Sequence, residues 1–259
     1  MRIDAHGHMQ SKRYDGWREY NKTQICSMDK WEIDMAAISV LPQEMKCVPE
    51  LFRQCNIDCH SYMREYKGRI MGYAFVNPGY AREAVEEIQR CFDIGMIGVK
   101  LYHSYFIDDP AVYPVIEKAI ELGIPILLHA GVSYQEALVR QQSHLSGPLN
   151  ILNVLKTYPE AIIIEGHIGG GGDWENVIEG LKLDSRIYAD TSGSVVDEWL
   201  IDTAVEELGA ERLLYANDCS FCEGVAKILS ADLTPGQRQK IFHENFENIL
   251  EHRKGGSLI

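Results

Sequence analysis

The feature that most constrains this chain is a regular alternation of short apolar runs with longer amphipathic stretches, from its first residues to its last. Short apolar runs are typical of buried strands, whereas apolar residues three and four positions apart are typical of helices. We count eight runs that predict strands, at residues 2–6, 36–41, 70–76, 97–101, 125–129, 161–166, 186–191 and 213–217. Strands that alternate with helices form a parallel sheet, and eight of them close a (β/α)8 barrel.

The length agrees with one such barrel. The chain has 259 residues, and a barrel of this kind uses roughly 250 residues as one domain. No linker or low-complexity tract interrupts the alternation, and a hydrophobic content of 46% is enough for a large buried core. We therefore expect residues 1–259 to form a single α/β domain, a (β/α)8 TIM barrel.

Local signals fix several helix ends. Gly95 and Gly123 each follow a run with helical spacing, where a C-terminal cap is expected. The last helix is predicted to begin at Thr234, with Pro235 in the first turn and Gln237 in the capping-box position. Residues 9–26 are polar and aromatic without clear periodicity, which indicates either an active-site loop or a surface excursion.

Charge and composition exclude several classes of partner. The chain carries 25 Lys+Arg against 38 Asp+Glu, a formal charge of −13, which repels nucleic-acid phosphates and anionic membranes. No apolar run approaches the roughly 18 residues of a membrane span, and the first residues lack a signal-peptide core. We expect a cytoplasmic protein with a small-molecule substrate, no nucleic acid and no membrane; monomer and homodimer both remain open.

The seven cysteines predict reduced thiols and not a disulfide framework. Their number is odd, and Cys55, Cys59 and Cys91 lie inside apolar patterns. Cys219 and Cys222 have CxxC spacing, but a zinc site needs a second pair of ligands and a redox motif needs a different surrounding fold. We assign this pair no function.

Histidine and aspartate recur where the predicted strands end. His6 and His8 follow the first strand on either side of a glycine, and alternate residues of an extended segment point the same way. His129 ends the fifth strand, His167 follows the sixth, and Asp218 follows the eighth. Each alone could be structural, but the C-terminal ends of barrel strands meet at one mouth, where such enzymes hold their active sites.

These motifs resemble the amidohydrolase superfamily, and most closely its amidohydrolase-2 branch, which includes aminocarboxymuconate-semialdehyde decarboxylase and related hydrolases and lactonases. The resemblance spans nearly the whole chain. Its motifs are IDAHGH at 3–8, GVKL at 98–101, LHAG at 128–131, GHIGG at 166–170, YADTSG at 188–193 and RLLYAND at 212–218. At strand eight the chain departs from the usual Gly-Ser-Asp-Tyr-Pro-Phe with residues 216–221 (ANDCSF), which keeps the acid and alters its neighbours.

The resemblance implies a metal site and two catalytic residues. His6, His8, His129 and Asp218 would hold one divalent ion, usually zinc, although manganese or iron(II) accepts the same ligands. An ion with an open position would activate a water molecule and polarise a substrate carbonyl. Asp218 would then accept the water's proton, and His167 would act as general acid or base.

Lys100 leaves the number of metals open. Distant members of the superfamily carry a carboxylated lysine at the end of strand four that bridges two metals, in which case His129 and His167 would ligate the second ion. Alternatively, an unmodified Lys100 would bind a substrate carboxylate or pair with an acid on a neighbouring strand. We favour one metal over a binuclear centre.

Other residues near the predicted mouth are candidates for substrate contact. We place Tyr102, His103, Trp174 and Phe221 in this group because each follows a predicted strand. Residues 169–172 are four consecutive glycines before Asp173, a predicted N-cap, and such a loop either presents amides to an anion or simply turns the chain. The spacing fits no nucleotide-binding motif.

Three functions remain after these arguments. The leading hypothesis is a metal-dependent hydrolase, in which metal-activated water attacks an ester, lactone or amide of a small carboxylate-bearing substrate. The second is a non-oxidative metal-dependent decarboxylase that uses the same site, with His167 handling the proton. The third is a non-catalytic metal-binding barrel, against which an acid–base residue beside the ligand set counts.

Overall fold

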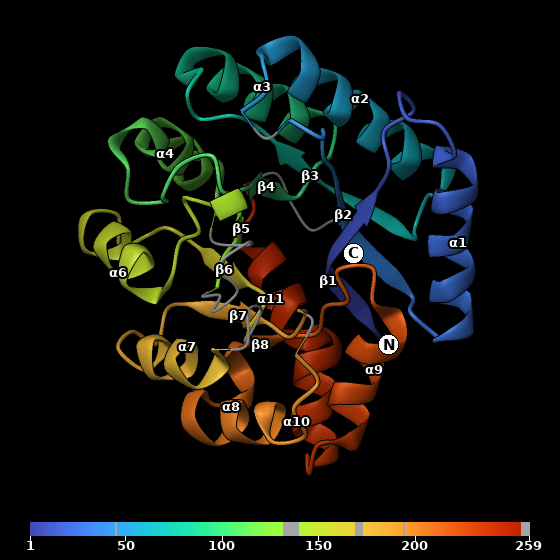
Figure 1. Ribbon diagram of the computed structural model, residues 1–259, viewed down its shortest axis with the longest axis vertical. Coiled ribbons are helices and arrows are strands. Elements are labelled where there is room, and N and C mark those ends of the chain that lie inside the picture. The colour runs from blue at the N-terminus through green and yellow to red at the C-terminus, as the bar shows by residue number, and fades with distance from the viewer. Residues whose placement is uncertain (45, 132–139, 169–172, 194, 255–259) are drawn as a thin grey trace.

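The computed structural model describes residues 1–44, 46–131, 140–168, 173–193 and 195–254. Eight parallel strands follow one another in sequence order around a barrel, with the helices outside them (Figure 1). This arrangement confirms the predicted (β/α)8 fold. The strands are β1 (Ile3–Met9), β2 (Met35–Val40), β3 (Ile70–Phe75), β4 (Gly98–Leu101), β5 (Ile126–His129), β6 (Ile163–Gly166), β7 (Tyr188–Asp190) and β8 (Leu213–Leu214).

The helices lie where the amphipathic stretches predict them. Gly123 caps α4 in the left-handed conformation, and Thr234 begins α10 with a complete capping box, as predicted. The α-helices are α1 (Trp17–Lys30), α2 (Pro49–Glu65), α3 (Ala81–Asp93), α4 (Tyr113–Leu122), α6 (Pro148–Thr157), α7 (Trp174–Leu181), α8 (Leu200–Leu208), α9 (Phe221–Ser230), α10 (Pro235–Gln239) and α11 (Asn245–Glu251). Shorter helical segments are η1 (Pro110–Val112), η2 (Ala210–Arg212) and the π-helical η3 (Lys240–Glu244).

Backbone hydrogen bonds between β1 and the residues that follow β8 close the barrel. Ala5 N donates to the Tyr215 carbonyl at 2.9 Å, and Asp218 N donates to the His6 carbonyl at 2.8 Å. The buried Asp4 carboxylate adds to this seam by accepting from the backbone and side-chain N–H groups of Asn217, both at 3.0 Å. The segment that carries Asp218 is thereby fixed against the strand that carries His6.

A bulge in β1 decides which way its histidines face. Asp4 pairs with Ala36 and Gly7 with Ile38, so β1 has one residue more than β2 between these pairs. An extra residue reverses the side-chain alternation. Odd-numbered Ile3 and Ala5 therefore pack in the barrel interior, and beyond the bulge even-numbered side chains enter the barrel instead.

The apolar core has two layers. The larger cluster fills the space between the strands and the surrounding helices, and the smaller one fills the barrel. Phe246, Ile249 and Leu250 of α11 belong to the smaller cluster and close the N-terminal end of the barrel. Polar residues lie at the opposite end, where the strands finish.

The interpretation of residues 9–26 as a loop is wrong for its second half. Helix α1 begins at Trp17 and buries Asn21, Gln24 and Met28. Two of these three residues are polar, and Asn21 exchanges hydrogen bonds with the backbone of Gln10, so the helix lacks a hydrophobic stripe that the sequence could reveal.

All seven cysteines are free thiols, and Cys55, Cys59 and Cys91 are buried as predicted. Within the described ranges, no helix has both the length and the apolar character needed to cross a bilayer.

Candidate active site at the C-terminal ends of the strands

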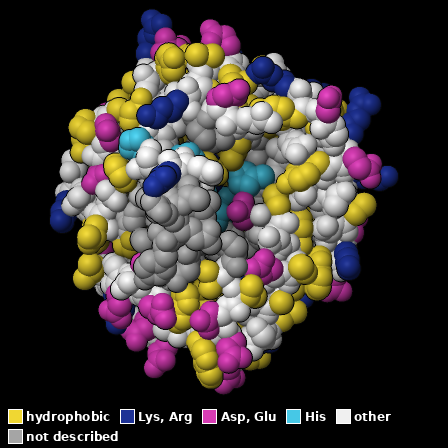
Figure 2. Space-filling view, in the orientation of Figure 1, with side chains coloured by type: hydrophobic (Ala, Val, Ile, Leu, Met, Phe, Trp, Pro, Cys, Tyr) yellow, Lys and Arg dark blue, Asp and Glu magenta, His cyan; other side chains and the backbone are white. Residues whose placement is uncertain are grey.

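Four histidines, a lysine and an aspartate meet where the strands end. His6 and His8 come from β1, Lys100 from β4, His129 from β5 and His167 from the residue after β6. Figure 2 shows histidine side chains in a hollow near the middle of this face, with an acidic side chain beside them. The structure thus brings together the residues that the sequence placed at one barrel mouth.

His6, His8 and Asp218 form a group that could hold a metal ion. Their potential ligand atoms lie within 4.8 Å of one another. His8 Nε2 is 3.1 Å and His6 Nε2 is 3.9 Å from Asp218 Oδ1. The other ring nitrogen of each histidine already has a partner: His6 Nδ1 contacts Asp190 Oδ2 at 2.7 Å, and His8 Nδ1 contacts Ser39 Oγ at 2.9 Å.

This donor set fits a divalent ion. Metal-binding histidines typically bond one nitrogen to a carboxylate, carbonyl or hydroxyl and direct the other at the metal. The Nε2 atoms of His6 and His8 both face Asp218, and that of His6 also contacts Lys100 Nζ. Imidazole with carboxylate suits zinc and also manganese or iron(II). A second potential group consists of His6, His167 and Asp190, and among the described residues His129 belongs to neither group. Its predicted role as a ligand stays a prediction.

Asp190 at the end of β7 organises the site, although no role is predicted for it from the sequence motifs. This fully buried carboxylate accepts from His6 Nδ1 through Oδ2. Its Oδ1 accepts from His167 N at 3.0 Å and from Ser192 N and Oγ at 2.9 and 2.5 Å. The rule that identified Asp218, an acid where a strand ends, would also have found Asp190.

His167 is held by hydrogen bonds at both ring nitrogens. Ser192 Oγ donates to Asp190, so it accepts from His167 Nδ1 at 2.9 Å. His167 Nε2 contacts His129 Nδ1 at 2.9 Å, and the Tyr102 ring stacks on His129 with centroids 4.0 Å apart. Two hydrogen bonds fix the His167 ring plane, with Nδ1 3.7 Å from Asp218 Oδ2.

The backbone is left-handed at both predicted catalytic residues. His167 has φ of 66° and Asp218 has φ of 44°, followed by Cys219 at 68°. Such values are uncommon for residues other than glycine and cluster at functional sites. The hydrogen bonds from His167 N to Asp190 and from Asp218 N to the His6 carbonyl hold these conformations.

Lys100 is fully buried and contacts His6, not an acid. Its Nζ lies 2.7 Å from His6 Nε2, and among the described residues no carboxylate oxygen is within hydrogen-bonding distance of it. The predicted alternative of an ion pair with an acid on a neighbouring strand is therefore wrong for this geometry. Burial lowers the pKa of Lys100 to about 8, which still leaves it mainly cationic at neutral pH.

Burial keeps His6, His129 and His167 neutral, whereas Asp190 and Asp218 stay ionised. Burial and the Lys100 charge lower the pKa of His6 to about 3, and burial likewise lowers the pKa of His129 and His167. Burial opposes ionisation of Asp218, but the hydrogen bond from His8 and the neighbouring imidazoles hold its pKa well below its usual range. Neutral imidazoles and an ionised carboxylate are the forms that bind metals.

The remaining candidates lie at different distances from this cluster. The His103 ring is 5.9 Å from that of His129, at the edge of the site. Trp174 is only 7% exposed and packs in the apolar core, and Phe221 packs partly buried against the same core. The roles of His103, Trp174 and Phe221 as substrate contacts stay predictions. The predicted glycine loop at 169–172 lies outside the described residues. Asp173 stands at the N-cap of α7 without a side-chain capping bond.

A pocket beside His8 extends the site towards α1. Its volume is about 430 Å³, within the range of small-molecule sites. Tyr14, Asp15 and Tyr20 come from the stretch interpreted as an active-site loop, and Gln43 follows β2. That stretch therefore contributes to the site wall, although its second half is helical.

Comparison with known proteins gives one family and one fold. The family model described as Amidohydrolase, of the amidohydrolase-2 type, matches residues 3–250. The 2,6-dihydroxybenzoate decarboxylase from Rhizobium is 17% identical with a TM-score of 0.76, over 96% of this chain and 98% of that one. At such identities the likeness establishes the shared fold alone.

Two further solved structures are similar to the same extent. A dihydroxybenzoic acid decarboxylase from Polaromonas sp. JS666, with bound manganese and the inhibitor 2-nitroresorcinol, is 18% identical with a TM-score of 0.76, over 96% of both chains. A provisionally assigned amidohydrolase from Staphylococcus aureus is 18% identical with a TM-score of 0.78, over 96% of this chain and 99% of that one.

Proposed function

Because the chain belongs to the amidohydrolase family, of the amidohydrolase-2 type, we propose that it is a divalent-metal-dependent, non-oxidative decarboxylase of a small aromatic or unsaturated carboxylic acid. The observation that carries this proposal is the convergence of His6 Nε2 and His8 Nε2 on Asp218, with His167 fixed beside them. Two of the similar structures are decarboxylases of hydroxybenzoic acids, which supports this reaction over the hydrolysis favoured by the sequence.

His6, His8 and Asp218 would hold the ion, with His129 as the fourth ligand that the resemblance implies. The bound ion would supply Lewis acidity, drawing electron density from oxygen atoms of the substrate. We propose one ion per chain and either zinc or manganese as its identity. Manganese gains support from the decarboxylase from Polaromonas sp. JS666, and zinc from the histidine-rich ligand set.

His167 would provide the proton that replaces the carboxyl group. When the bond from the carbon to the carboxylate breaks, CO₂ leaves, the electron pair stays on carbon, and one proton must be added there. Burial lowers the pKa of His167, so the ring is neutral in the free protein, and any proton that it takes up is readily passed on to carbon. Ser192 and His129 hold the ring so that its orientation is set before the substrate binds.

The pocket beside His8 would receive the substrate. The rings of Tyr14 and Tyr20 line it, and flat apolar surfaces of this kind suit an aromatic acid. Lys100, cationic and close to His6, supplies positive potential that would favour the substrate carboxylate.

Hydrolysis of an ester, lactone or amide is the second candidate function. Asp218 favours it, because this ionised carboxylate is 34% exposed at the mouth, where it could accept a proton from water. A substrate panel separates the two reactions: hydroxybenzoates release CO₂ only in a decarboxylase, and lactones are opened only by a hydrolase. Turnover of lactones without CO₂ release from any acid would refute the proposed reaction.

The role of His167 is tested by His167→Asn. Asparagine tolerates the left-handed backbone at this position better than alanine does. We expect metal content near that of the wild type and turnover lower by about 10²- to 10⁴-fold, with His60→Asn on α2 as a control that keeps full activity. Unchanged turnover in His167→Asn would refute the assignment.

Elemental analysis of the purified protein tests the number of metals. About one equivalent per chain would support the mononuclear site, and about two would make Lys100 and His167 ligands of a second ion. Absence of metal after reconstitution with zinc or manganese would refute the proposed function and favour a barrel without metal chemistry.

A further inference from the structure

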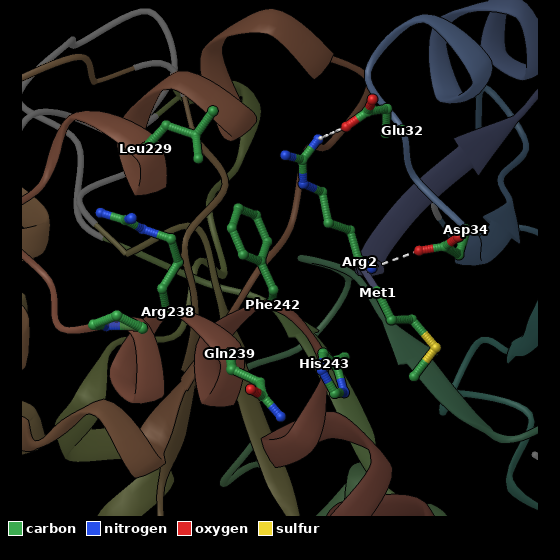
Figure 3. A pocket seen from close by; sticks show the side chains of 10 residues that line it. Met1, Arg2, Glu32, Asp34, Leu229, Arg238, Gln239, Phe242 and His243 are labelled. Atoms are coloured by element: carbon green, nitrogen blue, oxygen red, sulfur yellow. Dashed lines mark hydrogen bonds and ion pairs between the residues drawn. The ribbon is translucent and has the colours of Figure 1, made fainter.

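A second large pocket lies at the opposite end of the barrel from the candidate active site. It has a volume of about 670 Å³, and the proposed function makes no use of it. Arg2 and Asp34 lie directly before β1 and β2, so the pocket opens beside the N-terminal ends of these strands, whereas His6 and His8 lie towards the C-terminal end. We call it the N-terminal-face pocket; Figure 3 shows its lining side chains, which come also from α9, α10 and η3.

Arg238 on the wall of this pocket has unused hydrogen-bonding capacity. Its Nη2 donates to the Ala231 carbonyl at 3.3 Å, while its Nε is buried and has no acceptor among the described residues. Within the same ranges, no carboxylate lies within ion-pair distance of its guanidinium. A buried donor without an acceptor costs about 1–3 kcal/mol. An oxyanion in the pocket that contacted the accessible part of this guanidinium would balance its charge.

A second arginine, Arg2, and the aromatic ring of Phe242 also line this pocket. Figure 3 places Phe242 between Arg238 and Arg2. The Arg2 guanidinium lies over the Phe242 ring, 5.1 Å from its centroid, and is 3.6 Å from the exposed carboxylate of Glu32. Glu32 and Asp34 also line the pocket and offset the charge of Arg2, so the positive charge available to a ligand is that of Arg238.

The wall also contains an unusual backbone segment. Phe242 and His243 belong to η3, a π-helical turn within the helix that runs from α10 to α11. π-Helical turns are rare and are frequent at functional sites. The Ile241 carbonyl in this turn accepts from Tyr215 N at 2.9 Å, which ties the pocket wall directly to the residue after β8.

We propose that the N-terminal-face pocket binds a small organic oxyanion, a carboxylate or a phosphate ester that carries a flat apolar group. The planar guanidinium of Arg238 would bind the oxyanion, because its forked donors match carboxylate and phosphate oxygens. Leu229 and Phe242 would contact the apolar group. The volume of the pocket is within the range of small-molecule sites. This site is independent of the function proposed for the barrel mouth.

Two fluorinated probes test the proposal and distinguish the sources of the oxyanion. Binding of 4-fluorobenzoate and of 4-fluorophenyl phosphate to the full chain is followed by ¹⁹F NMR. We expect saturable binding of at least one probe to the wild type, and variants of Arg238 distinguish it from binding of an aromatic carboxylate at the barrel mouth. The probe that binds more tightly identifies carboxylate or phosphate as the preferred group. Absence of saturable binding of both probes would overturn the proposal.

Arg238 variants locate the binding site. Arg238→Met should weaken binding at least tenfold, and Arg238→Lys, which keeps the charge without the fork, should weaken it less. Arg82→Met on the exposed surface of α3 is the matched control and should bind as the wild type does. Thermal unfolding checks that each variant is folded; if Arg238→Met is not, Arg238→Lys and Phe242→Leu carry the test. Wild-type affinity in the folded Arg238 variants would overturn the proposal.

Discussion

Asp190→Asn should change the proton position on His6. The carboxylate of Asp190 accepts from His6 Nδ1 through one oxygen, and its other oxygen accepts from His167 N and from two groups of Ser192. Asparagine keeps one acceptor oxygen and replaces the other with an NH₂ donor. One side of this network must therefore face a donor instead of an acceptor.

The cheaper orientation keeps the amide oxygen towards His167 and Ser192, because two of the donors there are backbone N–H groups that cannot turn away. The NH₂ group then faces His6 Nδ1, which must become an acceptor, so the proton of the neutral ring moves to Nε2. A protonated Nε2 has no lone pair for a metal, and it also opposes Lys100 Nζ, which is 2.7 Å away.

The expected loss of metal affinity is about 10- to 100-fold, the usual effect of removing a carboxylate behind a metal-binding histidine. This loss equals roughly 1.4 to 2.8 kcal/mol of binding free energy. The free energy of unfolding should also fall by about 1.5–3 kcal/mol, because a buried hydrogen bond to a charged group is lost.

Competition between the protein and a chelator for zinc or manganese measures the affinity, and ¹⁵N NMR of the imidazoles reports the protonated nitrogen of His6. Ser192→Ala is the control: it removes one side-chain donor, keeps the Asp190 carboxylate, and should leave the proton on His6 Nδ1. Wild-type affinity in Asp190→Asn, with His6 still protonated at Nδ1, would refute this reasoning.

Two further predictions concern stability. Glu165 on β6 is fully buried, neither of its oxygens has a partner among the described residues, and burial raises its pKa from 4.5 to about 8. The folded state thus keeps this proton to higher pH than the unfolded state, so wild-type stability falls as pH rises from about 4.5 to about 8. In urea unfolding, the free energy of unfolding of Glu165→Leu minus that of the wild type should grow by roughly 3 kcal/mol between about pH 5 and pH 8. A difference that does not change with pH would contradict this prediction. Gly98→Ala should lower the unfolding free energy by about 1–3 kcal/mol, because the new Cβ would lie 2.6 Å from the Pro125 carbonyl oxygen. Gly236→Ala, with open space around it, is the control, and equal urea midpoints for the two would speak against the prediction.

The fold was predictable because its signals are local. Apolar runs mark strands, Gly123 and Thr234 mark helix ends, and the count of eight parallel strands leaves few ways to close the sheet. The site followed from the fold, since the C-terminal ends of parallel strands share one face. His6, His8, His167 and Asp218 could thus be assigned to one cluster before their contacts were known.

Helix α1 shows where local signals fail. Its buried face carries Asn21 and Gln24, and the hydrogen bonds that make burial of Asn21 acceptable are made with the backbone of Gln10, outside the helix. Hydrophobic periodicity records only apolar burial. A helix whose buried face is partly polar therefore reads as a loop in the sequence.

The sequence by itself determined the order of strands and helices, the barrel, and which residues stand at its mouth. Only the tertiary structure decided that a bulge turns His6 and His8 inward, that Asp190 fixes the rings behind the cluster, and that Lys100 contacts His6. Periodicity and capping act over a few residues and can be read along the chain. Strand register and side-chain contacts join positions as far apart as His6 and Asp190, and they exist only once the whole barrel has closed.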